Sequence, residues 1–333
     1  MVLLYVALRA RKPTMLLCCV LTAPRLVLNG AVRGACSSRH RHAAAAACAA
    51  PPPPSVPLPD GVLVVHKPQS WSSFSVVAKI RNTLQDHYRG HGHKFTGRKK
   101  LKVGHGGTLD PMATGVLVVG VGKGCKALEG YLRGSKSYAA VAQFGSETDT
   151  QDAEGVVIGE APFGHVTDDE LGAAAAGLTG EIMQRPPIYS ALKRDGKRMY
   201  ELARKGEVSE EEMEPRRVVV HELRLAPLQP ATGAVEMQIT CGGGTYVRSL
   251  VVELGRAVGS AAHMSALLRT QQGPFCIDDS WPPPSESLRR VTPVVEAEFT
   301  DAARLLAAME EAAQLLREVE EAEGAEKAEG VDG

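Results

Sequence analysis

Apolar and polar positions follow two different periods along this chain, one typical of strands and one typical of helices. Residues 216–225 and 234–241 alternate polar and apolar side chains, which predicts a pair of antiparallel strands. Residues 168–178 have a helical spacing, and Thr167 with Glu170 three residues later forms the capping box that starts a helix. The same patterns predict further strands at 61–66, 116–121, 138–144 and 156–158, and further helices at 72–84, 123–132, 248–258 and 296–323. Strands and helices mix without a regular strand–helix–strand repeat, so we predict an α+β fold.

Charge is unevenly distributed, although 38 basic and 38 acidic residues balance over the 333 residues of the chain. Residues 1–59 hold seven Lys or Arg, no acid and a proline run, a composition typical of a targeting presequence followed by a disordered linker. Residues 296–333 hold twelve acids and three bases. We therefore expect a disordered extension at 1–59, a folded domain at 60–280, and an acidic helix and tail at 281–333.

Cysteine usage and hydropathy exclude several classes of protein. The chain has seven cysteines, an odd number, and none of them forms a C-x-x-C pair. This favours reduced thiols in an intracellular protein over a disulfide framework or a zinc site. No segment is long and apolar enough to span a bilayer, so we expect no membrane partner.

The stretch with most chemical content is 103–124, VGHGGTLDPMATGVLVVGVGKG. A single acid, Asp110, stands between a glycine-rich run and a valine-rich strand, and Pro111 stiffens the turn behind it. Glycines at this density permit tight turns and the close approach of a ligand to the backbone. Taken alone, such an aspartate is more often a turn or capping residue than a catalytic group. A metal site made of His105 and Asp110 is a further alternative, but two ligands without a third make a poor site, and we predict no metal.

The same stretch resembles the signature GHxGxLDPxAxGxL of the TruB family of pseudouridine synthases, more closely its eukaryotic branch. Further blocks that resemble the family follow in order: VVHKPQSWSS at 64–73, KSY at 136–138, RPPIYSALK at 185–193, GKRMYELARKG at 196–206, GTYVRS at 244–249 and AHMSALLR at 262–269. The resemblance covers residues 61–275 and implies a catalytic domain built on a mostly antiparallel mixed sheet with flanking helices and loops. It also implies isomerisation of uridine to pseudouridine in RNA without any cofactor.

The resemblance assigns three catalytic residues. Asp110 would act as nucleophile or base near the ribose, and Arg248 would pair with it and favour its ionised form. Tyr138 would stack on the flipped base, where it replaces lost stacking. On residue chemistry alone, a strand tyrosine is more often part of the core, and an arginine at a helix start is often exposed.

The resemblance also assigns residues that bind substrate. His105 would help to displace the target nucleotide, and Lys67 and Lys126 would act electrostatically. Tyr246 and Leu268 would line the pocket for the uracil. A basic run at 89–102, with six Lys or Arg and no acid, looks like an insertion before the signature, and its Arg98, Lys99 and Lys100 are candidates for RNA backbone contacts. The alternative for this run is a solvated loop.

The substrate that the resemblance implies is U55 in the T-loop of tRNA, with T-loop-like stem-loops of mRNA as further substrates. We expect a monomer. We also expect no guide RNA, because guided relatives carry a PUA domain and only about 58 residues follow Phe275. A catalytically idle tRNA chaperone is the first alternative, against which the intact Asp110 argues. A hydrolase that uses Asp149 or Asp152 as a second carboxylate is another, although their TDTQDAEG context favours a turn.

Residues 1–59 should be dispensable for catalysis and important for location. A protein that starts near Pro59 should be fully active on a T-arm stem-loop, because the extension precedes the first family block and offers no core. Residues 1–59 fused to a fluorescent protein should direct it to an organelle, mitochondria first, with nuclear or cytosolic residence as the alternative. Diffuse fluorescence would reject the presequence, and an inactive truncated protein would show that the segment belongs to the enzyme.

Overall fold

The computed structural model describes residues 56–97, 100–277 and 288–329. The chain divides into two units, Met1–Pro54 and Ser55–Gly333, and all described residues belong to the second. The expected presequence lies almost entirely outside the described residues, as do Arg98 and Lys99 of the basic run. Within the described ranges, no helix has the length and apolar character needed to cross a membrane.

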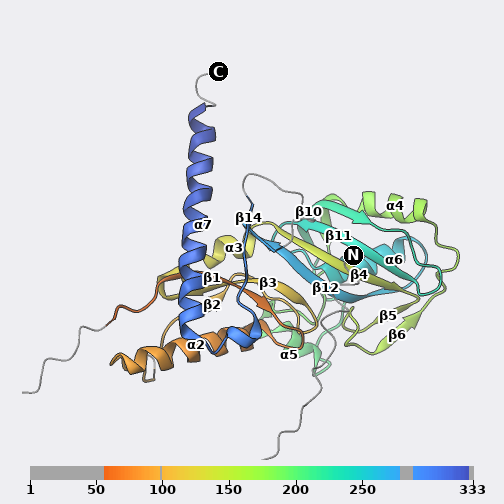
Figure 1. The fold of residues 1–333 in the computed structure, drawn as a ribbon. Coiled ribbons are helices and arrows are strands. Elements are labelled where there is room, and N and C mark those ends of the chain that lie inside the picture. Colours follow the sequence, from red (N-terminus) through yellow and green to blue (C-terminus); the bar gives the residue numbers. More distant parts are fainter. Residues whose placement is uncertain (1–55, 98–99, 278–287, 330–333) are drawn as a thin grey trace, which may run out of the picture. The chain divides into compact units, whose positions relative to one another are not determined.

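A ten-stranded sheet forms the centre of the second unit (Figure 1). Its main path runs β1-β3-β12-β4-β11-β10-β7. These strands are β1 (Gly61–Lys67), β3 (Thr114–Val121), β12 (Ala262–Gln272), β4 (Lys136–Phe144), β11 (Ala234–Cys241), β10 (Arg216–Leu225) and β7 (Gly180–Gln184). Three short strands complete the sheet: β2 (Val103–His105) on β3, β13 (Phe275–Cys276) on β12, and β14 (Arg289–Arg290) on β13. Only the β3–β12 and β13–β14 pairs are parallel, so the α+β prediction with a mostly antiparallel mixed sheet is confirmed.

Helices and two small hairpins surround this sheet. The helices are α2 (Ser73–Gly90), α3 (Leu128–Arg133), α4 (Asp168–Gly177), α5 (Met199–Ala203), α6 (Val247–Ala257) and α7 (Ala302–Glu329), with 3-10 turns at Gly122–Lys126 and Glu296–Glu298. The hairpins pair β5 (Ser146–Thr148) with β6 (Val157–Glu160), and β8 (Lys193–Arg194) with β9 (Lys197–Arg198). The predicted capping box of Thr167 and Glu170 is present at the start of α4. The predicted pair 216–225 and 234–241 is the antiparallel pair β10–β11.

The central strand β12 was not predicted as a strand, for a physical reason. Its polar residues Arg269, Thr270, Gln271 and Gln272 are buried together with its apolar ones, so no alternation marks it. Gln272 donates to the Gly106 carbonyl at 2.7 Å and accepts from the Val118 N–H at 2.9 Å. Buried polar groups need such partners, and the partners come from residues more than 150 positions away, which local sequence does not reveal.

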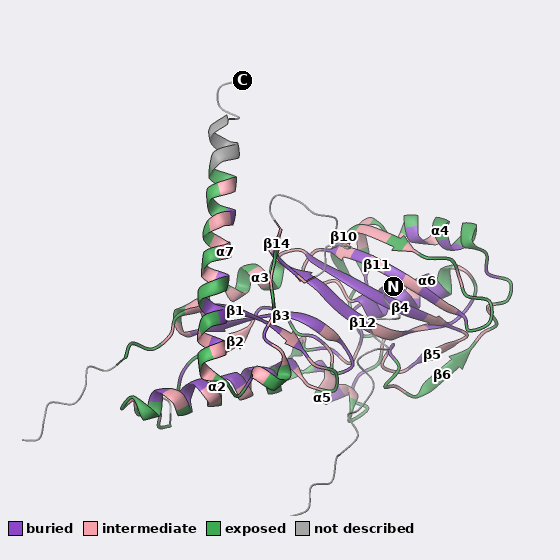
Figure 2. Ribbon diagram, viewed as in Figure 1, coloured by how far each residue is buried: buried purple, intermediate pink, exposed green. Residues whose placement is uncertain are grey.

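Apolar side chains pack on both faces of the sheet. Beneath α4 and α6, one cluster includes Leu171, Leu250 and Leu254. A second cluster joins α2 to β1 and β3, and a third lies on the other side of β1, since Val62 and Val64 belong to it and Leu63 and Val65 to the second. Figure 2 shows the resulting buried strands at the centre of the fold.

The C-terminal segment packs on the same body as the sheet. Phe299 is fully buried, contacts the Trp71 ring edge-on at 6.0 Å between centroids, and its carbonyl accepts from the Thr83 hydroxyl at 2.8 Å. Leu305 and Met309 of α7 lie in the cluster with α2. The segment therefore contributes core side chains besides its acidic residues.

Replacing Phe299 with Ala should destabilise the domain by about 3–5 kcal/mol, because the removed ring leaves a cavity in a packed core. Urea unfolding followed by circular dichroism measures the change. Leu132→Ala is the matched control, since Leu132 is more than half exposed and should cost far less. Equal loss in the two variants would contradict the role of the C-terminal segment in the core.

Candidate active site

Asp110 lies on the loop between β2 and β3, and this loop is held from two sides. The Ser73 hydroxyl at the start of α2 accepts from the Leu109 N–H at 2.8 Å and donates to the Leu109 carbonyl at 3.2 Å. On the other side, the Pro111 carbonyl accepts from the Ser70 N–H at 2.9 Å and from Lys67 Nζ at 3.1 Å. Both neighbours of Asp110 are therefore fixed by side chains or backbone of the first family block.

The glycines before Asp110 serve internal packing, which corrects the interpretation that they open the backbone to a ligand. A Cβ at Gly106 would lie 2.6 Å from the Cβ of Tyr131, and one at Gly104 would lie 3.1 Å from Leu128. Gly115, after the signature aspartate, has φ +104° and sits against the backbone of Arg269. Only glycine fits where two backbones approach so closely.

Arg248 meets Asp110 through two contacts. Its Nε lies 2.9 Å from Asp110 Oδ2, and its Nη2 donates to Oδ1 at 3.1 Å. Arg248 is only 4% exposed, so it is not the surface arginine that its place in the first turn of α6 would allow. Two-point contact between a guanidinium and a carboxylate is a strong and directional interaction.

Arg248 has further partners that fix its orientation. Its Nη1 donates to the Thr150 carbonyl at 2.8 Å, and its Nη2 also donates to the Tyr189 carbonyl at 3.1 Å. Asp152 Oδ2 lies 3.8 Å from Nη1 on the side away from the short Asp110 contacts. The guanidinium thus joins Asp110 to two other segments of the chain, the loop that holds Thr150 and Asp152 and the segment of Tyr189.

Burial and charge act on Asp110 in opposite directions. Burial raises the pKa of its carboxyl, and the Arg248 guanidinium lowers it, with a net pKa above the ordinary value. The carboxylates of Asp110 and Asp152 repel each other, which also raises the pKa of Asp110, while Lys67 lowers it. The Asp110 side chain is 30% exposed, so a ligand can reach its carboxylate. The ionisation of that carboxylate depends on Arg248.

Tyr138 and Leu268 come from adjacent strands beside the Asp110 loop. Leu268 of β12 is in register with Thr114 of β3 on one side and with Ala139 of β4 on the other. Tyr138 is in register with Arg269, and burial raises the pKa of its phenol to about 12. Each residue is only 8% exposed. Tyr138 belongs to the apolar cluster beneath α4 and α6. Leu268 pairs with Ala139 and not with Tyr138, so its side chain points to the opposite face of the sheet.

Tyr246 is held just before α6 by a single glutamine. Gln184, at the end of β7, accepts from the Tyr246 N–H at 2.8 Å and donates to the Tyr246 carbonyl at 3.0 Å. Since Tyr246 precedes Arg248 by two residues, this clamp also sets where α6 begins. Tyr246 as a whole is half-buried.

Lys67 is completely buried and acts on the Asp110 loop. Its Nζ donates to the carbonyls of Pro68, Trp71 and Pro111 at 2.9, 2.6 and 3.1 Å. Burial lowers its pKa to about 8. All three acceptors are protein carbonyls, so the ammonium of Lys67 faces the protein. Lys67 therefore positions the Asp110 loop, contrary to the expectation that it binds substrate.

Lys126 and Lys100 are not near Asp110, contrary to the expectation for Lys126. Asp110 precedes β3, whereas Lys126 follows it, and the seven residue steps from Thr114 to Val121 span about 23 Å. Lys100 precedes β2, whose Val103 is in register with Val121 at that same far end. His105 lies between the two ends, opposite Val119, and burial lowers its pKa. The length of β3 thus keeps Lys126 and Lys100 away from Asp110, although both lysines are close to Asp110 in the sequence.

Several residues beside the site were missed from sequence. Arg269 is buried and donates to the carbonyls of Val116 at 2.6 Å and Gly107 at 3.3 Å, which ties β12 to the signature. Asp152, considered only as a hydrolytic acid, is buried and accepts from the Thr150 hydroxyl at 2.6 Å and the Glu154 N–H at 3.0 Å. Arg269 is the charged last residue of the otherwise largely apolar block at 262–269, and this position could have indicated a buried structural role.

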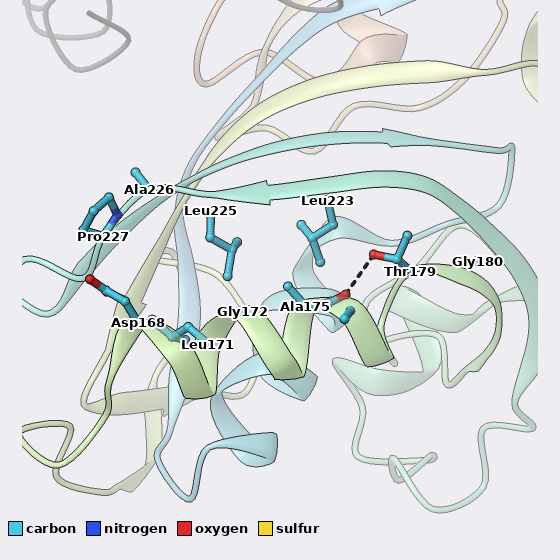
Figure 3. A pocket seen from close by; sticks show the side chains of 11 residues that line it. Asp168, Leu171, Gly172, Ala175, Thr179, Gly180, Leu223, Leu225, Ala226 and Pro227 are labelled. Atoms are coloured by element: carbon cyan, nitrogen blue, oxygen red, sulfur yellow. Dashed lines mark hydrogen bonds between the residues drawn. The ribbon is translucent and has the colours of Figure 1, made fainter.

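A pocket of about 560 Å³ lies away from this site, between α4 and β10 (Figure 3). Its walls are mostly apolar, with Leu171, Leu223 and Leu225 among them. Its one carboxylate, Asp168, already accepts from the Leu228 N–H at 3.0 Å. The groove offers no chemistry comparable to that around Asp110.

Comparison with known proteins identifies similar chains. Residues 94–247 match the model of the family described as "TruB family pseudouridylate synthase (N terminal domain)". The chain is 42% identical to the human protein "Pseudouridylate synthase TRUB1" over 66% of this chain and 62% of that one. It is 40% identical to the mouse protein of the same name over 72% and 73%, and 43% identical to "tRNA pseudouridine synthase B" of Aromatoleum aromaticum over 66% of each. The aligned part is thus less than two thirds of the human relative's length.

Replacing Arg248 with Met should raise the pKa of Asp110 further, because the cation that favours its carboxylate is lost. A 13C NMR titration of the aspartate carboxyls measures this, with the Asp110 signal assigned by its loss in Asp110→Asn. Arg256→Met is the matched control, since Arg256 is on the same helix but pairs with Glu147. An unchanged Asp110 titration in Arg248→Met protein that is folded by circular dichroism would contradict the electrostatic role.

Proposed function

Because the chain belongs to the TruB family of pseudouridine synthases, we propose that it isomerises uridine to pseudouridine within RNA, at U55 in the T-loop of tRNA. The observation that carries this proposal is the two-point contact between Arg248 and a partly accessible Asp110. The names of the bacterial and mammalian relatives support the class of reaction.

The reaction rearranges one nucleotide and needs a single well-placed carboxylate. The N1–C1′ bond of uridine breaks, the uracil turns, and C5 forms the new bond to C1′ while its proton leaves and N1 gains one. Nothing is oxidised or transferred to a second molecule, so no cofactor takes part. Asp110 acts at the ribose, either by attack on C1′ or by removal of a ribose proton. Both routes need the carboxylate, so activity should fall as pH drops through the pKa of Asp110.

Aromatic side chains near Asp110 suit a flipped base. A uridine within a folded loop must leave its stack before the bond to its sugar can be reached, and an aromatic face replaces the lost stacking. We assign that face to Tyr138, and apolar contact to Tyr246 just before α6 and to Leu268, whose side chain lies beside Gly115 of β3. A phenol whose pKa is about 12 remains protonated, so Tyr138 can donate or relay a proton near C5.

Groups around Asp110 position it rather than react. Arg248 holds both carboxylate oxygens, and Asp152 with the carbonyls of Thr150 and Tyr189 holds Arg248. Lys67 and Ser73 fix the loop on either side. A site fixed in this way before substrate arrives loses little free energy to reorganisation during the reaction.

Exposed bases provide an RNA surface on the segment between β7 and β10. The β8–β9 hairpin carries Lys193, Arg194, Lys197 and Arg198, all exposed. The same segment is joined to the site, since the Tyr189 carbonyl accepts from Arg248. We assign the tRNA T-arm to this surface, with T-loop-like mRNA stem-loops as further substrates, and a monomer without guide RNA as the active form.

The compartment is proposed from the composition of residues 1–59. The acid-free residues 1–59 favour an intracellular protein with a mitochondrial presequence, and nuclear or cytosolic residence is the alternative.

Asp110→Asn should reduce pseudouridine formation below a tenth of wild-type turnover while RNA affinity changes little, because an uncharged isostere removes no cation from the RNA contacts. Tritium release from 5-tritiated uridine in tRNA measures turnover, and filter binding measures affinity. Asp149→Asn is the matched control, since Asp149 accepts from the Val156 N–H in a turn and should retain activity.

Two outcomes would oppose the proposal. More than a tenth of wild-type turnover in Asp110→Asn would remove Asp110 from the chemistry. Free uracil released by the wild-type protein would indicate a hydrolase, and RNA binding without any turnover by the wild-type protein would indicate an idle chaperone.

A further inference from the structure

A second pocket lies at the end of β3 that is distant from Asp110. It has a volume of about 400 Å³ and is lined by residues from three separate segments, at 58–60, 100–102 and 122–126. Four of its lining residues are lysines, namely Lys100, Lys102, Lys123 and Lys126. We call this feature the lysine pocket.

Charge in the lysine pocket is only partly balanced. Asp60 is the one acid of its lining, and it is engaged by Lys123, whose Nζ lies 3.1 Å from Oδ2 and whose N–H donates to Oδ1 at 2.7 Å. For Lys100, Lys102 and Lys126, no carboxylate of the described residues lies within ion-pair distance of 4 Å. Three exposed cations that share a concave surface attract a polyanion more strongly than scattered ones.

The backbone beneath these lysines is fixed, so the cluster is part of the fold. Leu101 is buried between Lys100 and Lys102, and its N–H donates to Gln85 Oε1 at 3.2 Å. The Lys102 carbonyl accepts from the Gly122 N–H at 2.8 Å. The basic run 89–102 therefore does not end as a freely solvated loop, because its last residues are tied to α2 and to the end of β3.

The lysine pocket and the candidate active site lie at opposite ends of β3. β2 runs beside β3 from Val103, at the pocket, to His105, and the chain then continues to Asp110. The separation along β3 is about 23 Å. An A-form RNA helix rises roughly 2.8 Å per base pair along its axis, so this distance corresponds to about eight base pairs of stem.

We propose that the lysine pocket binds backbone phosphates of the substrate RNA about eight base pairs of stem away from the target uridine, and so selects substrates with a long enough helical stem. The proposal rests on the proposed function, because the target uridine defines the starting point of that distance. Lysine ammonium groups act here as point charges on phosphate and carry no sequence preference.

The test compares Lys100→Glu/Lys126→Glu with the unsubstituted lysines, in an Asp110→Asn background so that no turnover interferes with binding. Two RNAs are used: a full-length tRNA, and a minimal T-loop hairpin whose stem is shorter than the 23 Å reach. We expect affinity for tRNA to fall by about tenfold or more and the slope of log K against log salt to decrease by about two, one for each lost contact. The loss on the hairpin should be at least fivefold smaller.

A control variant distinguishes the effect of the lysine pocket from the effect of a changed net charge. Lys79→Glu/Arg217→Glu makes the same change in net charge on α2 and β10, outside the pocket, and should not produce the difference between the two RNAs. Equal losses on tRNA and hairpin would overturn the inferred reach, and an unchanged tRNA affinity and salt slope would overturn the pocket as a binding site. Turnover of the protein with Asp110 intact reports separately on the proposed function, so a failure of either proposal can be recognised.

Discussion

A buried guanidinium that must be neutralised is the constraint on which this site depends. Arg248 is almost completely removed from water, and an unpaired charge in that position would be strongly unfavourable. Asp110 contacts the guanidinium through both carboxylate oxygens. The carbonyls of Thr150 and Tyr189 accept further hydrogen bonds from its N–H groups. The β2–β3 loop, the β5–β6 region, the segment after β7 and the start of α6 are all brought to one point by these contacts.

The loop that carries Asp110 is held rigidly by buried side chains and close-packed glycines. Lys67 is surrounded by three carbonyls, Ser73 bonds both backbone groups of Leu109, and the glycines before the aspartate leave no space for a side chain. Arg269 adds a tie from the central strand to Gly107. The carboxylate therefore has a defined position while part of its surface remains open, a combination that favours catalysis over a purely structural ion pair.

β3 separates two kinds of surface on one rigid element. At its beginning lie the buried groups that act on a single nucleotide, and at its end lies the lysine pocket, whose charge is mostly unbalanced. In the proposed function, short-range contacts at the first end act on the reacting base, whereas charge at the other end acts on the RNA backbone irrespective of sequence. A stiff strand keeps the two at a constant distance, which is the basis of the proposed selection for stem length.

Local sequence was sufficient for features that depend on neighbours in the chain. The alternation of β10 and β11, the capping box of α4 and the helix after Ser72 follow from side chains a few residues apart, and the motif around Asp110 indicated the family. Tertiary structure decided the rest: that β12 is the central strand, that Lys67 is buried, that Lys126 joins Lys100 instead of Asp110, and that Phe299 completes the core. Each of these depends on partners far away in the sequence, because burial and pairing are properties of the folded chain that periodicity and spacing do not encode.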